Sequence, residues 1–213
     1  MFEGFTPETA DFLWGIRFNN NREWFLQHKQ QYIDCLYDPM KALGAELFTP
    51  FVDKPGQLLK VSRIYRDARL HHPLPYKESL WICIRQDVPW WAEHPCLFFE
   101  IAPEGISYGF LLWSPQVTYM EDFRRKISEQ PDVFLKLIKK TEKAVGMRIT
   151  AEQYKRPKKT EDARLAPYFA WKKGISCIRE EPFGPETFGP ELKDRVGEFF
   201  RKLTPLYEYF NQF

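Results

Sequence analysis

Hydrophobic residues in the first fifty positions recur at helical spacing. Thr6, followed at once by proline and glutamate, offers a helix cap, so a helix is predicted to run to about Phe18. Asn20 and Glu23 have the spacing of a capping box and predict the start of a second helix. The apolar face of that helix contains Phe25, Tyr32, Leu36, Met40, Leu43 and Leu47. Pro39 lies within this pattern and is expected to kink or divide the helix.

The spacing changes from helical to alternating in the middle of the chain. Four segments rich in β-branched or aromatic residues have this alternation: residues 58–65, 79–86, 97–102 and 107–113. They are predicted to be strands. The sequence Pro103-Glu104-Gly105 has the composition of a turn, so the last two segments are expected to pair as an antiparallel hairpin.

Helical spacing returns after Ser114, with a break predicted before Pro131 and a stop at Gly146. A short strand is expected over residues 175–179, and a last helix from Pro190 nearly to Phe213. Because helices begin and end the chain and strands cluster between them, we predict an α+β fold. Its central, mostly antiparallel β-sheet would have N- and C-terminal helices packed on it, and residues 1–213 would form a single globular domain.

Composition excludes disorder and a surface that is basic throughout. Aromatic residues make up 17% of the chain and charged residues 28%, which is typical of a globular protein. The formal net charge of +2 leaves little long-range field to capture a polyanion. The N-terminus has no basic region followed by an apolar run, and no apolar stretch has the roughly 20 residues of a spanning helix. We therefore expect a soluble, cytoplasmic protein with no membrane partner.

The spacing of cysteines and histidines predicts no disulfide and no metal site, and we expect no cofactor. The four cysteines form no CxxC pair and are interpreted as free thiols in a reducing compartment, with Cys83 and Cys177 buried in strands. His71 and His72 are adjacent and lack a further ligand at a recognised spacing. Phosphate-loop, dinucleotide, hydrolase-elbow and zincin motifs are all absent, so the sequence specifies no reaction type and leaves open whether the protein is an enzyme.

An arginine cluster carries the main functional hypothesis. The candidate residues for binding an anionic ligand are Arg63, Arg66, Asp67, Arg69, Tyr76 and Lys77. If residues 59–65 form a strand, Arg63 shares a face with the apolar Leu59, Val61 and Tyr65 and needs a partner there. One carboxylate cannot satisfy three guanidinium groups, which leaves donors for a small phosphate- or carboxylate-bearing ligand.

Two alternatives stand beside that hypothesis. Glu100 or Glu23 could supply the missing negative charge, in which case the arginine cluster is structural. A basic segment around Lys155 and Arg156 interleaves cations with aromatic residues and could contact nucleic acid or a protein partner. A charged loop is more often only a solvated surface, so nucleic acid is the weaker expectation.

Several motifs together resemble one protein family. They are Gly4-Phe5, the run from Asn19 to Phe25, His28-Lys29, Tyr32, Pro39, the segment from Arg63 to Arg69, Pro75-Tyr76-Lys77 and Lys155-Arg156-Pro157-Lys158. In order and spacing they are similar to the domain of unknown function 2461 family, from the N-terminus to about residue 180. The resemblance implies a stand-alone domain and assigns no activity. Arg22 and His28 are secondary site candidates within it, with Lys155 and Arg156.

Overall fold

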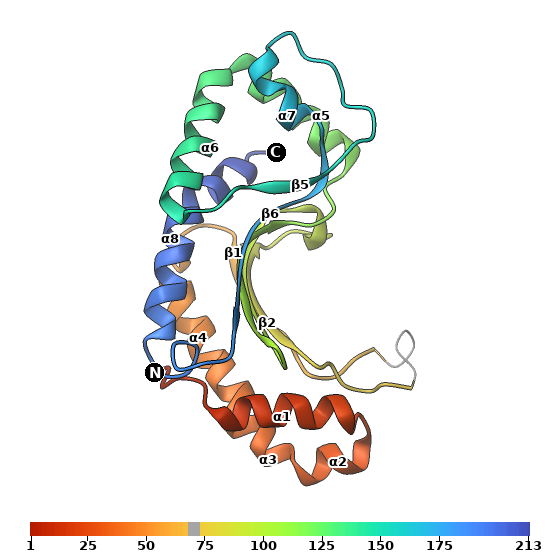
Figure 1. Ribbon diagram of the computed structural model, residues 1–213, viewed down its shortest axis with the longest axis vertical. Coiled ribbons are helices and arrows are strands. Elements are labelled where there is room, and N and C mark those ends of the chain that lie inside the picture. The colour runs from red at the N-terminus through yellow and green to blue at the C-terminus, as the bar shows by residue number, and fades with distance from the viewer. Residues whose placement is uncertain (68–72) are drawn as a thin grey trace. The chain divides into compact units, whose positions relative to one another are not determined.

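The computed structural model describes residues 1–67 and 73–213 (Figure 1). The α-helices are α1 (Pro7–Phe18), α2 (Arg22–Gln27), α3 (Lys29–Gln31), α4 (Asp38–Phe48), α5 (Val117–Glu129), α6 (Pro131–Val145), α7 (Ala166–Phe169) and α8 (Leu192–Phe210). The strands are β1 (Gln57–Val61), β2 (Leu80–Gln86), β3 (Cys96–Ala102), β4 (Gly105–Leu112), β5 (Thr150–Gln153) and β6 (Trp171–Pro182). A π-helical segment (Tyr32–Tyr37) joins α3 to α4, and short 3₁₀ turns cover Thr49–Phe51, Trp91–Glu93 and Ala163–Leu165.

The strands form one antiparallel sheet in the order β1-β2-β3-β4-β6-β5. With helices at both ends of the chain, this sheet confirms the predicted α+β fold, and β3 and β4 form the predicted hairpin. The first predicted strand ends early, because β1 stops at Val61; beyond it, a backbone bond from Ser62 to Trp81 and the isolated bridge between Tyr65 and Tyr76 continue the pairing. The strand β6 is longer than residues 175–179, and β5 was not predicted.

The described chain divides into two compact units. One contains residues 1–84, 98–108 and 179–197, and the other contains residues 85–97, 109–178 and 198–213. The strands β2, β3, β4 and β6 pass from one unit into the other, so neither unit is a continuous stretch of chain. The expectation of a single domain over residues 1–213 stays a prediction.

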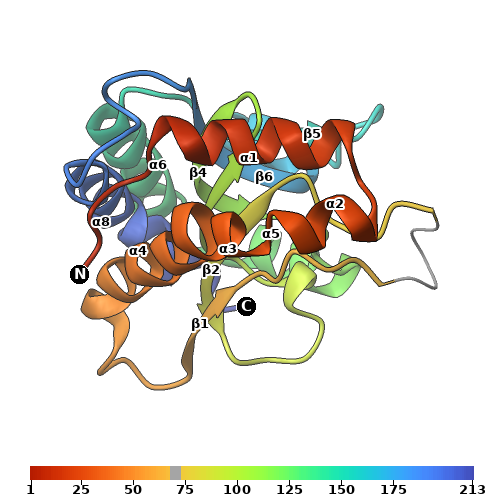
Figure 2. The ribbon, with the colours of Figure 1, turned by 90° about the horizontal axis from the view of Figure 1, so that it is seen from below.

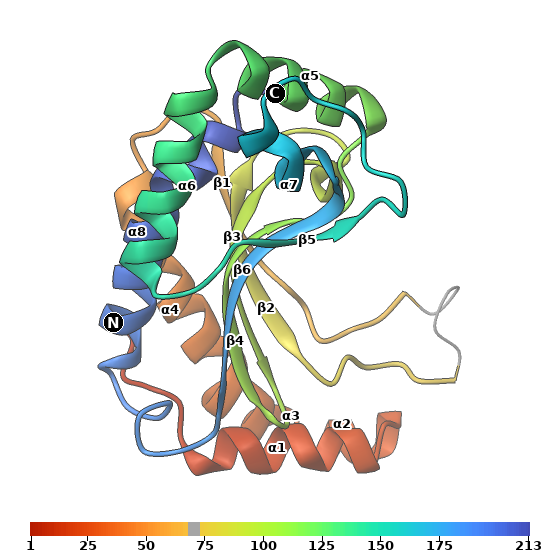
Figure 3. The ribbon, with the colours of Figure 1, turned by 45° about the horizontal axis from the view of Figure 1, so that its top comes forward.

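In the first unit, the N-terminal helices pack as a group. The helix α1 runs alongside the segment from α2 to α4, and α4 also packs against β1 (Figure 2). Aromatic rings fill the space beneath them: Phe5 stacks on Phe99 of β3, which stacks in turn on Tyr108 of β4. All three are buried to 2% exposure or less. The β3–β4 turn lies beside α1 (Figure 3).

The predicted irregularity at Pro39 is a π-helical segment that directly precedes α4. Proline has no N–H, so it cannot donate the usual helical hydrogen bond to the carbonyl of Cys35, four residues earlier. The hydroxyl of Thr9 in α1 donates to this carbonyl instead, at 2.7 Å. A buried threonine therefore replaces the missing helical donor and ties α1 to the π-helical segment.

The predicted capping box at Asn20 is wrong by one residue. The cap of α2 is Asn21, whose side-chain oxygen accepts from the backbone N–H of Trp24 at 2.9 Å. Asn20 cannot cap because its side chain bonds both backbone groups of Tyr76, at 3.0 Å each. A long-range pairing thus takes the residue that the local pattern assigned to the helix.

In the second unit, α5 packs on α6 around an aromatic cluster. Phe123 contacts Phe134 edge-to-face at 5.4 Å and stacks on Trp171 at 6.1 Å, and all three rings are buried.

The four cysteines are free thiols, three of them buried, as expected for space-filling side chains in a core. Among the helices of the described residues, none is long and apolar enough to cross a membrane.

Candidate functional site

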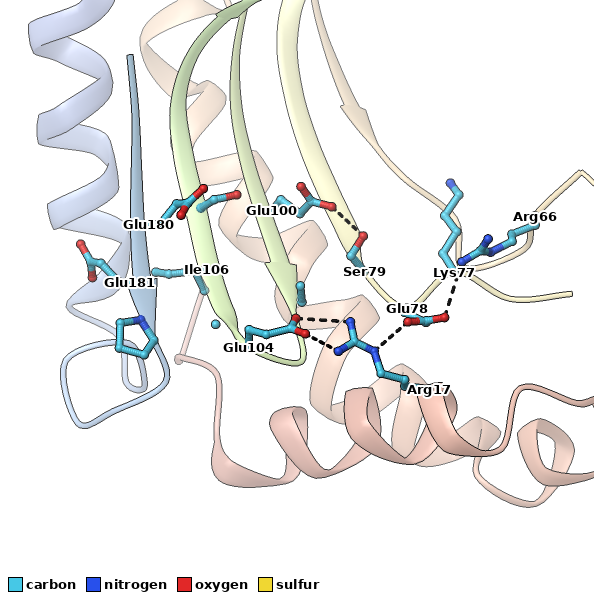
Figure 4. Close-up of a pocket in the computed structure, with 14 residues that line it drawn as sticks. Arg17, Arg66, Lys77, Glu78, Ser79, Glu100, Glu104, Ile106, Glu180 and Glu181 are labelled. Atoms are coloured by element: carbon cyan, nitrogen blue, oxygen red, sulfur yellow. Dashed lines mark hydrogen bonds and ion pairs between the residues drawn. The ribbon is translucent and has the colours of Figure 1, made fainter. Parts of the chain in front are cut away.

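A cavity of about 680 Å³ opens within the first unit, at the ends of the strands β2, β3, β4 and β6 (Figure 4). We call it the Lys77 pocket. Its lining residues are Arg17, Arg66, Lys77, Glu78, Ser79, Glu100, Ala102, Glu104, Gly105, Ile106, Ser107, Glu180, Glu181 and Pro182. The volume falls in the range of small-molecule sites, roughly 300 to 1,000 Å³.

Short backbone pairings place Arg66 and Lys77 at the pocket. Residues Tyr65 and Tyr76 form an antiparallel bridge, and the N–H of Lys77 donates to the carbonyl of Ile64 at 2.7 Å. The two segments are thereby held side by side, and the residues that follow each tyrosine, Arg66 and Lys77, are brought to the same cavity.

The backbone of Tyr76 is a fixed point in this arrangement. Its N–H donates to the side-chain oxygen of Asn20, and its carbonyl accepts from the Asn20 amide at 3.0 Å and from Nε of Arg66 at 2.6 Å. The ring is 4% exposed and stacks on Phe25 of α2 at 4.3 Å. Tyr76 therefore holds Arg66 in place through backbone bonds, while its own side chain belongs to the core.

On the cationic side, Arg17 of α1 lies between two carboxylates (Figure 4). Its Nε donates to Glu78 at 2.7 Å, and its two terminal nitrogens donate to both carboxylate oxygens of Glu104 in the β3–β4 turn. Hydrogen bonding to Arg17 lowers the pKa of Glu104. The guanidinium of Arg66 is less engaged, because its Nη2 lies 3.8 Å from Glu78. The guanidinium of Arg17 is thus fully engaged in internal ion pairs, whereas that of Arg66 keeps N–H donors for a ligand.

Lys77 has no carboxylate partner among residues 1–67 and 73–213. Its ammonium group lies 5.6 Å from the ring centre of Trp81, and the side chain extends away from Glu78 (Figure 4). Burial lowers the pKa of Lys77, and the positive charges of Arg63 and Arg66 lower it further. A half-buried ammonium beside two guanidinium groups is an electrostatically unfavourable arrangement that a bound anion would relieve.

The opposite side of the pocket is acidic. Glu100 of β3 accepts from the hydroxyl of Ser79 at 2.6 Å, and Glu180 on β6 is exposed. In the described part of the chain, neither carboxylate has a cationic partner. The pocket therefore presents cations at one side and hydrogen-bond acceptors at the other.

Glu181 lines the same side but is occupied internally. It accepts from the hydroxyl of Tyr108 at 2.6 Å and lies 2.9 Å from a nitrogen of Arg195. Burial and the bond to Glu181 raise the pKa of Tyr108 to about 12, so its hydroxyl keeps its proton and remains a donor at neutral pH. Gly105 allows β4 to approach β6 here, because a side chain on it would collide with the Glu181 carbonyl.

Of the residues predicted to form the anion site, Arg66 and Lys77 line the pocket, and Tyr76 supports it from the core. Arg63 and Asp67 are exposed and are not among the lining residues. Arg69 lies outside the described residues, as do His71 and His72.

The expectation that Arg63 lies on an apolar face is wrong. After β1 ends at Val61, burial alternates with the opposite phase: Ser62 and Ile64 are buried, whereas Arg63 is exposed. The hydroxyl of Ser62 accepts from the backbone N–H of Trp81, taking over a bond that the strand ladder would otherwise make. Arg63 is consequently solvated, and no buried partner is required for it.

The secondary candidates lie elsewhere. Arg22 is exposed in the first turn of α2, and His28 stacks on Trp24 at 4.0 Å while its Nδ1 contacts the Trp24 carbonyl at 2.8 Å. Lys155 and Arg156 are exposed after β5, in the second unit. None of the four lines the Lys77 pocket.

Part of the basic charge around Arg156 is already neutralised. Lys158 lies 3.6 Å from Glu121, and both Lys172 and Lys173 pair with Glu152. A surface whose lysines are paired internally attracts a polyanion less strongly than the sequence count suggests. This observation favours the Lys77 pocket over the basic segment as the candidate site.

Sequence reasoning missed the acidic side of the pocket and the role of Arg17. Glu100 was considered only as a partner for the arginines, but its carboxylate accepts from Ser79. Glu78 directly follows Lys77, so its proximity in sequence could have placed it among the candidate site residues. Arg17 and Glu180 carry no such signal, because the fold brings them together from distant parts of the chain. Among the described residues, no group of three or more possible metal ligands occurs.

Comparison with known proteins agrees with the resemblance noted from the motifs. The model of the family described as conserved hypothetical protein (DUF2461) matches residues 8–209. No match was found among curated proteins. Since the match spans both compact units and nearly the whole chain of 213 residues, the protein belongs to the DUF2461 family.

Proposed function

We propose that the Lys77 pocket binds a small ligand bearing an anionic group, either a phosphate or a carboxylate. The observation that carries this proposal is the pair of Arg66 and Lys77, which face the cavity with donors that no described carboxylate uses fully. An anion placed between them would accept from both side chains in a partly desolvated setting, where charge-assisted bonds are strong.

The acidic side of the pocket narrows the class of ligand. Glu100 and Glu180 supply acceptors for hydroxyl or amino groups on the same molecule, and they repel a second anionic group. The proposed ligand is therefore a small molecule with one anionic end and a polar, donor-bearing remainder.

Thermal unfolding with and without phosphate or acetate tests the proposal. Binding to the folded state alone stabilises it by about 2.7 kcal/mol when the ligand is at roughly 100 times its Kd. We expect these anions to raise the melting temperature of the wild type, and to do so far less for Lys77→Gln. Lys159→Gln is the matched control, because it removes an exposed lysine from the second unit.

Two outcomes would contradict the proposal. Phosphate and acetate could leave the wild type unaffected at concentrations well above those of cellular metabolites. Alternatively, they could stabilise Lys77→Gln and Lys159→Gln equally, which would show that the anions act on the surface as a whole and not at the pocket.

A further inference from the structure

A second cavity, of about 380 Å³, lies within the other compact unit. We call it the Trp90 pocket. It is bordered by the 3₁₀ turn Trp91–Glu93 and by the first turns of α5, and its aromatic and charged lining residues are Trp90, Glu93, His94, Tyr119, Asp122 and Phe213. It shares no residue with the Lys77 pocket, so a role for it is independent of the function proposed for that pocket.

The aromatic walls of this pocket meet at steep angles. The ring of Tyr119 is inclined at 83° to His94 and at 60° to Phe213, with ring centres 6.5 and 5.4 Å apart. The hydroxyl of Tyr119 donates to the carbonyl of Phe210, which fixes the orientation of a ring that is only 8% exposed. Rings inclined at such angles form walls that face in different directions, so that both ring faces and ring edges border the pocket.

Trp90 has an unusual position at the same cavity. Its side chain is 77% exposed, so core packing does not account for it. Among the non-glycine residues that the structure describes, it alone has a positive φ, at 54°. The left-handed region is unfavourable for a bulky side chain and is retained where the surroundings impose it.

Hydrogen bonds hold the turn that begins at Trp90. The Trp90 carbonyl accepts from the N–H of Glu93 at 2.8 Å, and the next residue accepts from His94 at 3.1 Å. The carbonyl of Ala92 accepts from the N–H of Ser114, two residues after the end of β4, at 2.9 Å. The indole is therefore displayed to solvent from a fixed backbone.

The charge of the lining is negative. Glu93 accepts from the neutral side chain of Gln116 at 2.7 Å, and Asp122 pairs with Arg125 at an exposed position. The lining contains no lysine or arginine. Aromatic faces attract cations through the ring quadrupole, and nearby carboxylates add to this attraction while repelling anions.

From these observations we propose that the Trp90 pocket is a binding site for an organic cation, specifically for a methylated ammonium group. Such a group is weakly hydrated and gives up little solvation when it contacts aromatic rings. The pocket offers it the rings of Trp90, Tyr119 and Phe213 and the charge of Glu93. A primary ammonium keeps a stronger hydration shell and is expected to bind less tightly.

Calorimetric titration of the full chain with choline tests this site. The control ligand is 3,3-dimethyl-1-butanol, which has the shape of choline but no charge. We expect saturable binding of choline and, because cation–π attraction and the Glu93 charge are lost, about tenfold weaker binding of the uncharged analogue. Equal affinity of the two ligands, or no saturable binding of choline, would overturn the proposal.

Substitutions at Trp90 locate the effect. Trp90→Gly removes the ring but suits a positive φ, so we expect the melting temperature to stay or rise while choline binding is lost. Trp90→Phe keeps an aromatic face and should retain most of the binding. Trp14→Ala, which removes a partly exposed tryptophan from α1, should bind choline like the wild type. Unchanged choline binding by Trp90→Gly would contradict the assignment.

Discussion

At the scale of single residues, the Lys77 pocket depends on side chains that form hydrogen bonds with backbone groups. Asn20 bonds both the N–H and the carbonyl of Tyr76, as a neighbouring strand would, and Arg66 bonds the same carbonyl. These contacts set the direction of the chain as it enters Lys77. Lys77, which carries the proposed binding, is therefore positioned in part by Asn20, a residue that does not line the Lys77 pocket.

The charge state of Lys77 gives a pH prediction. Burial and the neighbouring arginines lower its pKa in the folded, ligand-free protein, so it loses its proton below the ordinary lysine value of about 10.4. A bound anion favours the charged form and raises this pKa again. Anion affinity is then full below the lowered pKa and falls as pH rises through it.

Sulfate is a suitable probe, because its charge stays constant over the alkaline range. We expect its affinity, measured by calorimetry over the alkaline range, to fall as pH rises towards about 10.4, before ordinary lysines titrate. Lys77→Gln should bind sulfate weakly with little pH dependence in that range. A wild-type affinity that does not change over the range would show that Lys77 takes no part.

At the scale of secondary structure, a missing hydrogen-bond donor decides how two helices join. Pro39 leaves the Cys35 carbonyl without its helical partner, and Thr9 of α1 supplies one at 2.7 Å. The same hydroxyl accepts from the N–H of Thr6 at the start of α1. A single buried side chain therefore serves both the beginning of one helix and the irregular turn of another.

Replacing Thr9 by valine tests this role, since valine has nearly the same shape but no hydroxyl. The change leaves a carbonyl and an N–H without their partner, so we expect a loss of about 1 to 3 kcal/mol in the free energy of unfolding. Thr9→Ser keeps the hydroxyl and should lose less. Urea denaturation measures both variants, and equal losses would mean that packing of the methyl group dominates.

At the scale of the whole molecule, the sequence predicted the fold better than the site. The α+β class, the helix at residues 7–18 and the β3–β4 hairpin were confirmed, because each has a strong hydrophobic period or a turn of typical composition. The strand β5 was missed because its short, mostly exposed sequence Thr-Ala-Glu-Gln at the sheet edge has no apolar alternation.

The site was predicted only in part, for a different physical reason. Arg66 and Lys77 are close in sequence, so their density was visible. The acidic side depends on which strands become neighbours, since Glu100 and Glu180 lie 80 positions apart and meet only through the order of the sheet. Local patterns contain no information about such a meeting. The prediction for Arg63 failed because β1 ends at Val61 and the buried positions beyond it are Ser62 and Ile64.

Four strands, β2, β3, β4 and β6, run from one compact unit into the other. The coding sequence therefore cannot be cut at one point into two parts that each encode one unit. The boundaries between the units lie inside these strands and inside α8. Hydrogen-bonded backbone of this kind is a poor substrate for a protease. We expect limited trypsin digestion to release no stable fragment that corresponds to either unit, as judged by mass spectrometry. A fragment that begins at residue 109 would start within β4 and lack its hairpin partner β3. The two pockets are therefore expected to be inherited together: recombination that exchanges one unit must replace several separate stretches of coding sequence at once.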